Sequence, residues 1–155
     1  MAAAIIVVAG VAAACGSAAT AQPAASAAAS VPAASSAAPA GGNPAVMTAT
    51  VGTQGMLLVA GANGMTVYTF GKDVANSGTS ECTGACITRW PALTIPAGST
   101  PAGGSGVTGT LGTITRADDG STQVTYNGLP LYFFSGDTAP GDANGIYAGW
   151  SAVKP

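Results

Sequence analysis

Two copies of one short pattern lie 64 residues apart in this 155-residue chain. Each copy reads Tyr-x-Phe-x-x-Asp and follows an Asn-Gly step. The residues are Tyr68, Phe70 and Asp73 in the first copy, and Tyr132, Phe134 and Asp137 in the second. Self-similarity at a fixed spacing indicates a tandem duplication, in which each copy belongs to one structural unit. The duplication therefore predicts one domain built from two related repeats, at about 52–95 and 107–155.

The first third of the chain differs in composition from the rest. All nine aromatic residues occur at Tyr68 or later, and all ten charged residues occur at Lys72 or later. The preceding residues are mostly Ala, Ser, Pro, Gly and Val, which cannot bury enough apolar surface to offset the entropy lost on folding. We therefore predict a disordered tether over 16–45 and a folded domain over 46–155.

The charge and the missing residue types exclude several functions. The net charge is −2 with only four Lys and Arg, so no basic patch is available to neutralise nucleic acid phosphates. The chain has no histidine, which removes the commonest general base and the commonest metal ligand. A serine paired with Lys72 or Lys154, or two converging aspartates, stays open, but no nucleophile turn is evident. We expect a protein that is not an enzyme.

An apolar run from Ala2 to Ala14 precedes the first cysteine, Cys15. The run is too short to cross a bilayer, which needs roughly 20 apolar residues, but it suits the hydrophobic region of a signal peptide. The small residues before Cys15 resemble the lipobox of bacterial lipoproteins, although Ala12 stands where Leu is usual. That resemblance implies a signal peptide over 1–15 and acyl chains, such as palmitate, that anchor Cys15 to the cell membrane.

Ordinary secretion is the alternative for this N-terminal region. Cleavage after Ala19-Thr20-Ala21 would remove Cys15 together with the signal peptide and release the domain from the cell. No Lys or Arg precedes the apolar run, although signal peptides usually begin with a positively charged segment. This departure indicates a start codon that lies further upstream.

Turn signals and β-branched residues dominate the chain from Met56 onward. Asn-Gly and Asp-Gly steps flanked by alternating apolar residues are the strongest short-range hairpin signal. Three such turns join residues 56–60 to 65–70, residues 110–116 to 121–126, and residues 123–126 to 129–134. Long helical periodicity is not evident, and a Gly/Pro/Ser-rich loop at 97–106 divides the halves. The predicted fold is all-β: two tandem β-meander repeats that form one small sandwich- or barrel-like domain.

The repeated pattern has a structural and a functional interpretation. Tyr and Phe two residues apart point to the same face of a strand, so the four rings are expected to share one core, capped by Trp90 and Trp150. An Asp three residues later can accept backbone N–H bonds and fix the following turn. On the functional interpretation, Asp137, Asp142 and Asn144 form a loop that binds a hard cation such as Ca²⁺. We favour the structural interpretation and expect no other cofactor.

Several segments together resemble one bacterial family. They are the two Tyr-x-Phe-x-x-Asp copies, Cys82-Thr-Gly-Ala-Cys86 followed by Trp90-Pro91, and Tyr126-Asn-Gly128-Leu-Pro130-Leu-Tyr132. These segments are similar to the secreted lipoproteins named for a Yx(F/W/Y)xxD motif, although a single Pro91 stands where relatives often have two. The likeness covers about 56–155. It implies an exported repeat protein of unknown activity and supplies no catalytic residues.

Cys82 and Cys86 remain as an even pair if Cys15 is lipidated. In an oxidising compartment such a pair indicates a disulfide, and a turn around Gly84 would bring the two Cα atoms within bridging range. A redox-active or metal-binding pair is the alternative, although the spacing is not Cys-x-x-Cys and further soft ligands are lacking. The expected function is a non-catalytic cell-envelope lipoprotein that binds an unidentified ligand or has a structural role. A cation-binding or redox accessory module of the envelope is the alternative.

Overall fold

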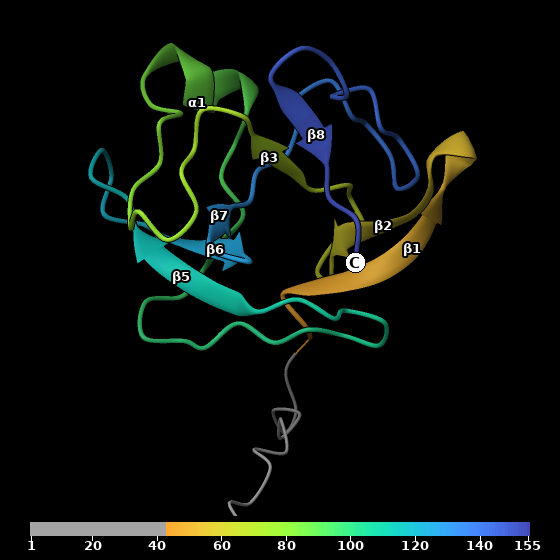
Figure 1. Cartoon of the computed structure of the whole chain (residues 1–155), viewed down its shortest axis with the longest axis horizontal. Coiled ribbons are helices and arrows are strands. Elements are labelled where there is room, and N and C mark those ends of the chain that lie inside the picture. Colours follow the sequence, from red (N-terminus) through yellow and green to blue (C-terminus); the bar gives the residue numbers. More distant parts are fainter. Residues whose placement is uncertain (1–42) are drawn as a thin grey trace, which may run out of the picture. The chain divides into compact units, whose positions relative to one another are not determined.

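The computed structural model describes residues 43–155, which form short strands joined by long loops (Figure 1). In chain order the elements are β1 (Val46–Val51), the 3-10 turn η1 (Gly52–Gln54), β2 (Gly55–Ala60), β3 (Tyr68–Phe70), α1 (Ala85–Arg89), β4 (Thr94–Ile95), β5 (Leu111–Thr115), β6 (Thr122–Tyr126), β7 (Leu129–Pro130) and β8 (Trp150–Ala152). The all-β prediction is confirmed, with the single turn of α1 as a small addition. Within residues 43–155, no helix is long and apolar enough to span a membrane.

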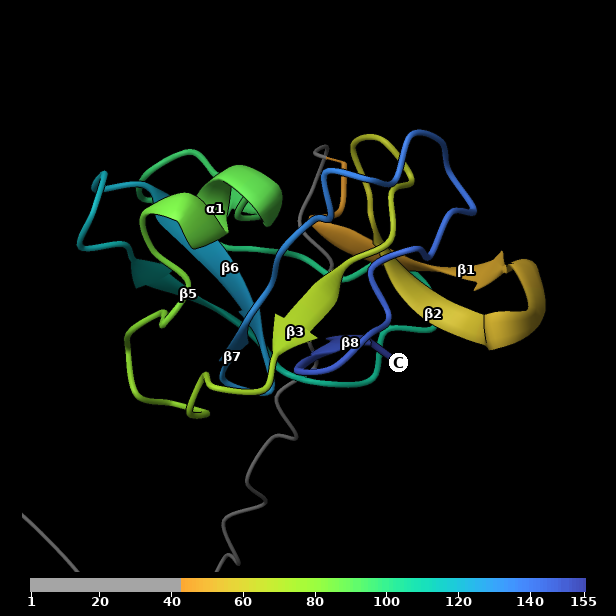
Figure 2. The same cartoon turned by 90° about the horizontal axis from the view of Figure 1, so that it is seen from above.

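The strands of the described region form three small antiparallel sheets. β1 pairs with β2, β3 pairs with β8, and β6 lies between β5 on one side and β4 and β7 on the other. Figure 2 shows β3 and β8 side by side, between the β1–β2 hairpin and the sheet that contains β5 and β6. None of these sheets closes on itself, so the sandwich-like form of the prediction fits the observed arrangement.

Two of the predicted hairpins are formed by paired strands. β5 and β6 pair from Leu111↔Tyr126 to Thr115↔Thr122. β6 turns into β7 through Asn127 and Gly128, whose φ angles of 50° and 80° are the positive values that a two-residue type I′ turn requires.

The remaining predicted strand pairings are only partly right. The hairpin after β2 closes at its turn, where the amide of Ala60 donates to the carbonyl of Met65 at 2.8 Å, but β3 then pairs with β8. The strand predicted over 129–134 ends as β7 at Pro130, because Tyr132 pairs with residues outside this hairpin. In both cases the second half of the expected strand pairs with a segment that is distant in the sequence.

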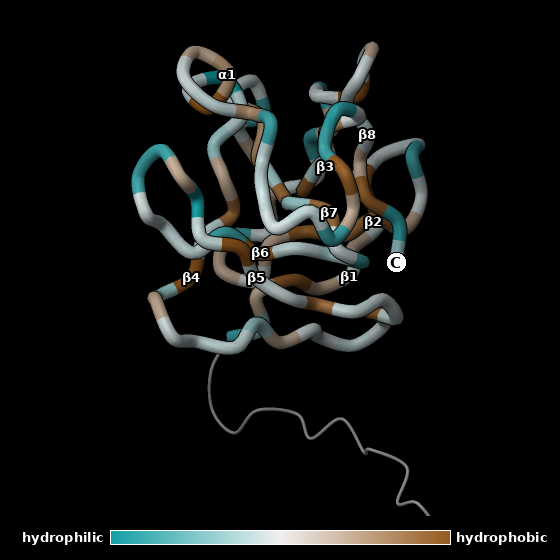
Figure 3. The backbone as a smooth tube through the Cα atoms, turned by 60° about the vertical axis from the view of Figure 1, so that its left-hand side comes forward, coloured by the Kyte–Doolittle hydropathy of each residue, from teal (hydrophilic) through white to brown (hydrophobic). Residues whose placement is uncertain are grey.

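The two larger parts of the core are an aliphatic one and an aromatic one, and a third, small cluster contains Val51, Leu57 and Val59. The aliphatic part contains Val46, Leu58, Ala60, Val67, Leu93, Val124, Tyr126, Leu131 and Val153. The aromatic part contains Tyr68, Cys82, Trp90, Tyr132, Phe134 and Trp150. Figure 3 shows that hydrophobic stretches follow the strands, whereas hydrophilic ones gather at loop tips. Both parts draw residues from the two predicted repeats, so the repeats share one core.

The two repeats complete each other through reciprocal backbone pairing. β3 of the first repeat pairs with β8 of the second, and residues 131–135 of the second pair in the same way with residues 89–93 of the first. Tyr68 and Tyr132 lie where these pairings meet, since the amide of each donates to the carbonyl of the other at 2.8 and 2.9 Å. Each tyrosine strand is therefore bordered by the tryptophan segment of the other repeat.

Candidate functional site

The repeated motif forms two crossed Tyr–Asp pairs. The hydroxyl of Tyr68 donates to Asp137 Oδ2 at 2.6 Å, and the hydroxyl of Tyr132 donates to Asp73 Oδ2 at 2.7 Å. Both tyrosines are fully buried, and the aspartates are 9% and 8% exposed. Each bond therefore joins one repeat to the other inside the protein, a pairing that the spacing within one motif does not reveal.

The second oxygen of each aspartate binds the loop that follows it. Asp73 Oδ1 accepts a hydrogen bond from the amide of Glu81, and Asp137 Oδ1 accepts one from the amide of Asn144, both at 2.8 Å. Each carboxylate thus accepts from a tyrosine hydroxyl through one oxygen and from a backbone amide through the other. Bonds of this kind to an ionised acceptor are roughly twice as strong as neutral ones.

Burial sets the protonation state of this site. It raises the pKa of both Tyr68 and Tyr132 far above that of a free phenol, and the bond to Asp137 raises the pKa of Tyr68 further. Burial also raises the pKa of Asp73, against the lowering effect of the amide of Glu81 and the hydroxyl of Tyr132. The tyrosines therefore stay neutral near pH 7 and act as hydrogen-bond donors, not as phenolate nucleophiles.

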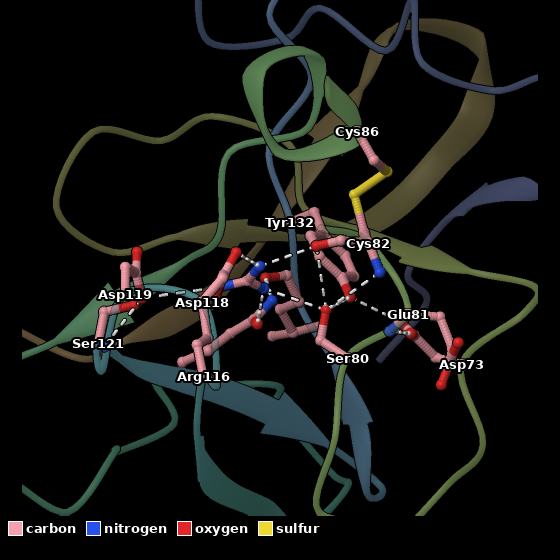
Figure 4. Close-up of polar contacts among 12 residues, drawn as sticks. Asp73, Ser80, Glu81, Cys82, Cys86, Arg116, Asp118, Asp119, Ser121 and Tyr132 are labelled. Carbon is pink, nitrogen blue, oxygen red and sulfur yellow. Dashed lines mark hydrogen bonds and ion pairs between the residues drawn. A yellow bond between two sulfur atoms is a disulfide. The ribbon is translucent and has the colours of Figure 1, made fainter. Parts of the chain in front are cut away.

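Arg116 extends one Tyr–Asp pair into a longer network (Figure 4). Its guanidinium donates through Nη1 to Ser80 Oγ at 3.0 Å, and Ser80 Oγ lies 2.7 Å from the hydroxyl of Tyr132. Because that hydroxyl donates to Asp73, Ser80 is the donor in its bond to Tyr132. The chain of donors runs from Arg116 through Ser80 and Tyr132 to Asp73.

The other Tyr–Asp pair has a different neighbour. The amide of Gly145 donates a hydrogen bond to the hydroxyl oxygen of Tyr68 at 3.3 Å. Only glycine fits at this position, since a Cβ atom there would lie 2.9 Å from the rings of Tyr68 and Trp90. The two pairs are thus alike in their Tyr–Asp bond and differ in what surrounds it.

Arg116 is a site residue that the sequence interpretation missed. Its side chain is 1% exposed and also donates to Gln123 Oε1, to the carbonyl of Cys82 and to Asp118 Oδ2, at 2.7 to 2.8 Å. An arginine two residues before an Asp-Asp-Gly turn is typical of an exposed hairpin end. The available signal was its rarity, because the chain has only four basic residues.

A small pocket borders this network. It has a volume of about 50 Å³ and is lined by Thr79, Ser80, Thr83, Thr115, Arg116, Ala117 and Asp118. Such a volume holds a few water molecules at most. Arg116 Nε is buried without a hydrogen-bond partner in the described region, and Asp119 Oδ1 lies 3.9 Å from it. The pocket is too small to serve as a substrate cleft.

The residues of the predicted cation loop are engaged in hydrogen bonds within that loop. Asp142 Oδ2 accepts from the amides of Thr138 and Ala139 at 2.8 and 3.0 Å, and these bonds lower the pKa of Asp142. Asn144 donates its backbone amide to Asp137. Among residues 43–155, no three His, Cys, Asp or Glu side chains converge as metal ligands. Calcium binding by this loop stays a prediction.

The aromatic core is built around two stacked tryptophans. Trp90 and Trp150 lie face to face, with ring centroids 3.6 Å apart and planes 3° from parallel. They were expected to cap the core, but they lie inside it, 3% and 6% exposed. Phe134 packs against Trp90, and the half-buried Phe70 stacks on Trp150 at 4.4 Å. Each repeat thus supplies one tryptophan and one flanking phenylalanine.

The predicted disulfide is present. Cys82 and Cys86 are bonded, with Cα atoms 5.2 Å apart, and Cys86 lies in α1. Cys82 is fully buried against the aromatic core, and Cys86 packs at the edge of that core. By contrast, Cys15, the predicted signal peptide and all but the last three residues of the predicted tether lie outside the described residues.

A family model of secreted repeats matches the chain twice, at residues 48–94 and 112–154. The chain belongs to this family of secreted repeats of unknown function. The two matches confirm the tandem duplication, and the secreted character of the family places the protein outside the cytoplasm. The first matched segment contains Asp73 and Trp90 and the second contains Asp137 and Trp150, so the Tyr–Asp bonds and the tryptophan stack join the two secreted repeats. No curated protein and no solved structure matches the chain.

Replacing Arg116 with Met is expected to lower the free energy of unfolding by about 2–4 kcal/mol, because two buried acceptors, Gln123 Oε1 and the carbonyl of Cys82, lose their donor. Asp118 is 27% exposed and can be rehydrated, so its loss adds little. Urea unfolding followed by tryptophan fluorescence measures the change. Arg89→Met is the control at an exposed arginine and is expected to shift stability by less than about 1 kcal/mol. Equal effects of the two substitutions would contradict the role given to Arg116.

Proposed function

We propose that this protein is a non-catalytic lipoprotein of the bacterial cell envelope, whose β domain binds a ligand or has a structural role at the cell surface. Acyl chains on Cys15 would hold it to the membrane, and residues 16–45 would act as the tether. The secreted character of the family and the lipobox-like sequence before Cys15 support this assignment. More than one acyl chain is needed for stable anchoring, which the lipoprotein modification supplies.

The non-catalytic assignment rests on one observation, which is that the buried polar side chains form hydrogen bonds with other groups of the protein. General acid–base catalysis needs a titratable group within hydrogen-bond reach of the substrate. Asp73 and Asp137 instead use both carboxylate oxygens for bonds within the protein, and Tyr68 and Tyr132 donate their protons to them. These groups hold the two repeats together, and the adjoining pocket has a volume of only about 50 Å³.

A binding role would fall to the loops that follow the two aspartates. The two loops differ in sequence and length, whereas the strands and rings that carry them are equivalent. They also present large apolar side chains to solvent: Val74 in the first loop, and Ile146 and Tyr147 in the second. Binding residues lie disproportionately on loops that a rigid scaffold holds in place.

The anchoring proposal is tested by expressing the full chain and Cys15→Ala in a bacterial host and separating membranes from the culture medium. The full chain is expected in the membrane fraction, with a mature N-terminus at an acylated Cys15, and Cys15→Ala is expected to leave that fraction. Ser17→Ala, a matched change two residues away, is expected to behave like the full chain. A released mature product that begins at Gln22 would exclude the lipid anchor.

A further inference from the structure

The two loops that lead from an aspartate to a tryptophan are closed by different means. The second loop, at residues 138–149, has no cysteine, and the side chain of Asp142 closes it through bonds to the amides of Thr138 and Ala139. The first loop, at residues 74–89, contains the Cys82–Cys86 bridge. Each loop is followed by one of the two stacked tryptophans, Trp90 after the first loop and Trp150 after the second. The fold of a repeat therefore does not require a disulfide, and the bridge is an additional feature of one repeat.

The two sulfur-bearing residues differ in access to solvent. Cys82 is completely buried, whereas Cys86 is partly exposed and follows three exposed residues, 83–85. Thiol–disulfide exchange needs an approach to one sulfur of the bridge, and its rate depends on which sulfur is attacked. Access in this structure favours attack at Cys86, with Cys82 as the leaving group.

The bridge lies between the polar network, which Figure 4 shows beside Cys82, and the aromatic part of the core. On one side, the carbonyl of Cys82 accepts from Arg116 Nη2 at 2.8 Å, and its amide donates to Ser80 Oγ at 3.3 Å. On the other side, the carbonyl of Cys86 accepts from the amide of Trp90 at 2.8 Å. The turn that carries Cys86 is also held by a bond from the amide of Cys86 to the carbonyl of Thr83, and its end is held by a bond from the amide of Ser135 to the carbonyl of Arg89. Cutting the bridge would leave Cys82 fixed and loosen the turn that precedes Trp90.

We propose that Cys82–Cys86 is a thiol–disulfide exchange site whose partner is a dithiol, either a small molecule or a reducing protein outside the cytoplasm. A thiolate of the dithiol attacks Cys86 Sγ, the bond between the two cysteines breaks, and Cys82 Sγ leaves as a thiolate that takes up a proton. The second thiol of the partner, as its thiolate, attacks the partner sulfur of the mixed disulfide and releases Cys86 as a thiolate. The bridge gains two electrons and is reduced, while the dithiol is oxidised to its disulfide.

Reduction would act first on the loop of one repeat. The turn at residues 83–89 gains freedom beside Trp90, whereas the loop that carries Trp150 keeps its Asp142 bonds. Because the two tryptophans stack face to face, a small displacement of Trp90 changes their mutual contact. This inference concerns residues 74–90 only and does not depend on the lipid anchor or on the proposed binding role.

The test uses the full chain with Cys15→Ala, so that only the bridge cysteines react. Millimolar dithiothreitol without denaturant is expected to reduce the bridge within minutes, as mass analysis after alkylation shows. The near-ultraviolet circular dichroism of the tryptophans is expected to change and to recover on reoxidation. Resistance of the bridge until the protein unfolds would overturn the proposal.

Two single-cysteine variants in the same background test which sulfur is attacked. In Cys82→Ser the remaining Cys86 is expected to form a mixed disulfide with oxidised glutathione at least tenfold faster than Cys82 does in Cys86→Ser. Equal rates, or a faster Cys82, would overturn the assignment of the attacked sulfur. If either variant does not fold, digestion of the wild-type protein after trapping with glutathione identifies the modified cysteine. Glutathione on Cys86 supports the proposal, and glutathione on Cys82 contradicts it.

Discussion

Neither repeat is expected to fold by itself when the chain is cut between Ser105 and Gly106, and an equimolar mixture of the two fragments is expected to regain the fold. The cut falls at two exposed residues, after the segment at 102–104 that pairs with β1. β3 would lose β8, and residues 131–135 would lose residues 89–93. Both Tyr–Asp bonds would also be broken.

The size of the fragments strengthens this expectation. A domain of about 60 residues buries only about 60% of the surface of its unfolded chain and is marginally stable. Each fragment would in addition expose half of a shared core. Circular dichroism and thermal melts of the fragments, alone and mixed, measure the outcome. Cooperative melting of either fragment alone would contradict the shared core, since it would show that one repeat is self-sufficient.

Trp90→Ala is expected to lower the free energy of unfolding by about 3–5 kcal/mol, the range for large aromatic residues that leave a cavity. Trp90 is 3% exposed, and its ring contacts four others, those of Tyr68, Phe134, Tyr147 and Trp150. Aromatic pairs contribute about 0.5–1.5 kcal/mol each beyond the burial of area, so the upper end of the range is expected. A small domain has about 5–15 kcal/mol in total, so this substitution brings the protein close to unfolding.

Urea denaturation of Trp90→Ala followed by far-ultraviolet circular dichroism measures this loss. Val74→Ala is the control in the same loop, because Val74 is 66% exposed and its truncation is expected to change stability by less than about 0.5 kcal/mol. A loss below about 1.5 kcal/mol for Trp90→Ala would contradict the central place of the tryptophan stack, because it would lie in the range of ordinary substitutions.

Local chemistry explains which parts of the fold the sequence predicts. Asn127-Gly128 specifies its turn because both residues adopt positive φ. The disulfide follows from a short spacing and a turn at Gly84. β1 was missed because its turn, at Gly52–Gln54, has no Asn-Gly or Asp-Gly step. Structure that is specified by a few neighbouring residues can be predicted from one sequence, whereas a strand without such a local signal cannot.

The partners within the site could not be predicted for a different reason. The motif places a tyrosine and an aspartate five residues apart, which favours a contact within one repeat. In the structure each tyrosine instead binds the aspartate of the other repeat, because Tyr68 and Tyr132 pair through their backbones. The role of Arg116 could not be predicted for the same reason, since its acceptors Ser80 and Cys82 come from the other half of the chain. Contacts that depend on how the repeats associate have no signature in one repeat.

The exchange of partners between the repeats is tested most directly by double-mutant cycles that start from Tyr68→Phe. Combined with Asp137→Ala, this substitution is expected to show a coupling energy of about 1–3 kcal/mol, since the two side chains share a buried bond to a carboxylate. Combined with Asp73→Ala, the aspartate of its own repeat, it is expected to show less than about 0.5 kcal/mol, the additivity limit for independent sites. Coupling of Tyr68 to Asp73 but not to Asp137 would contradict the crossed arrangement.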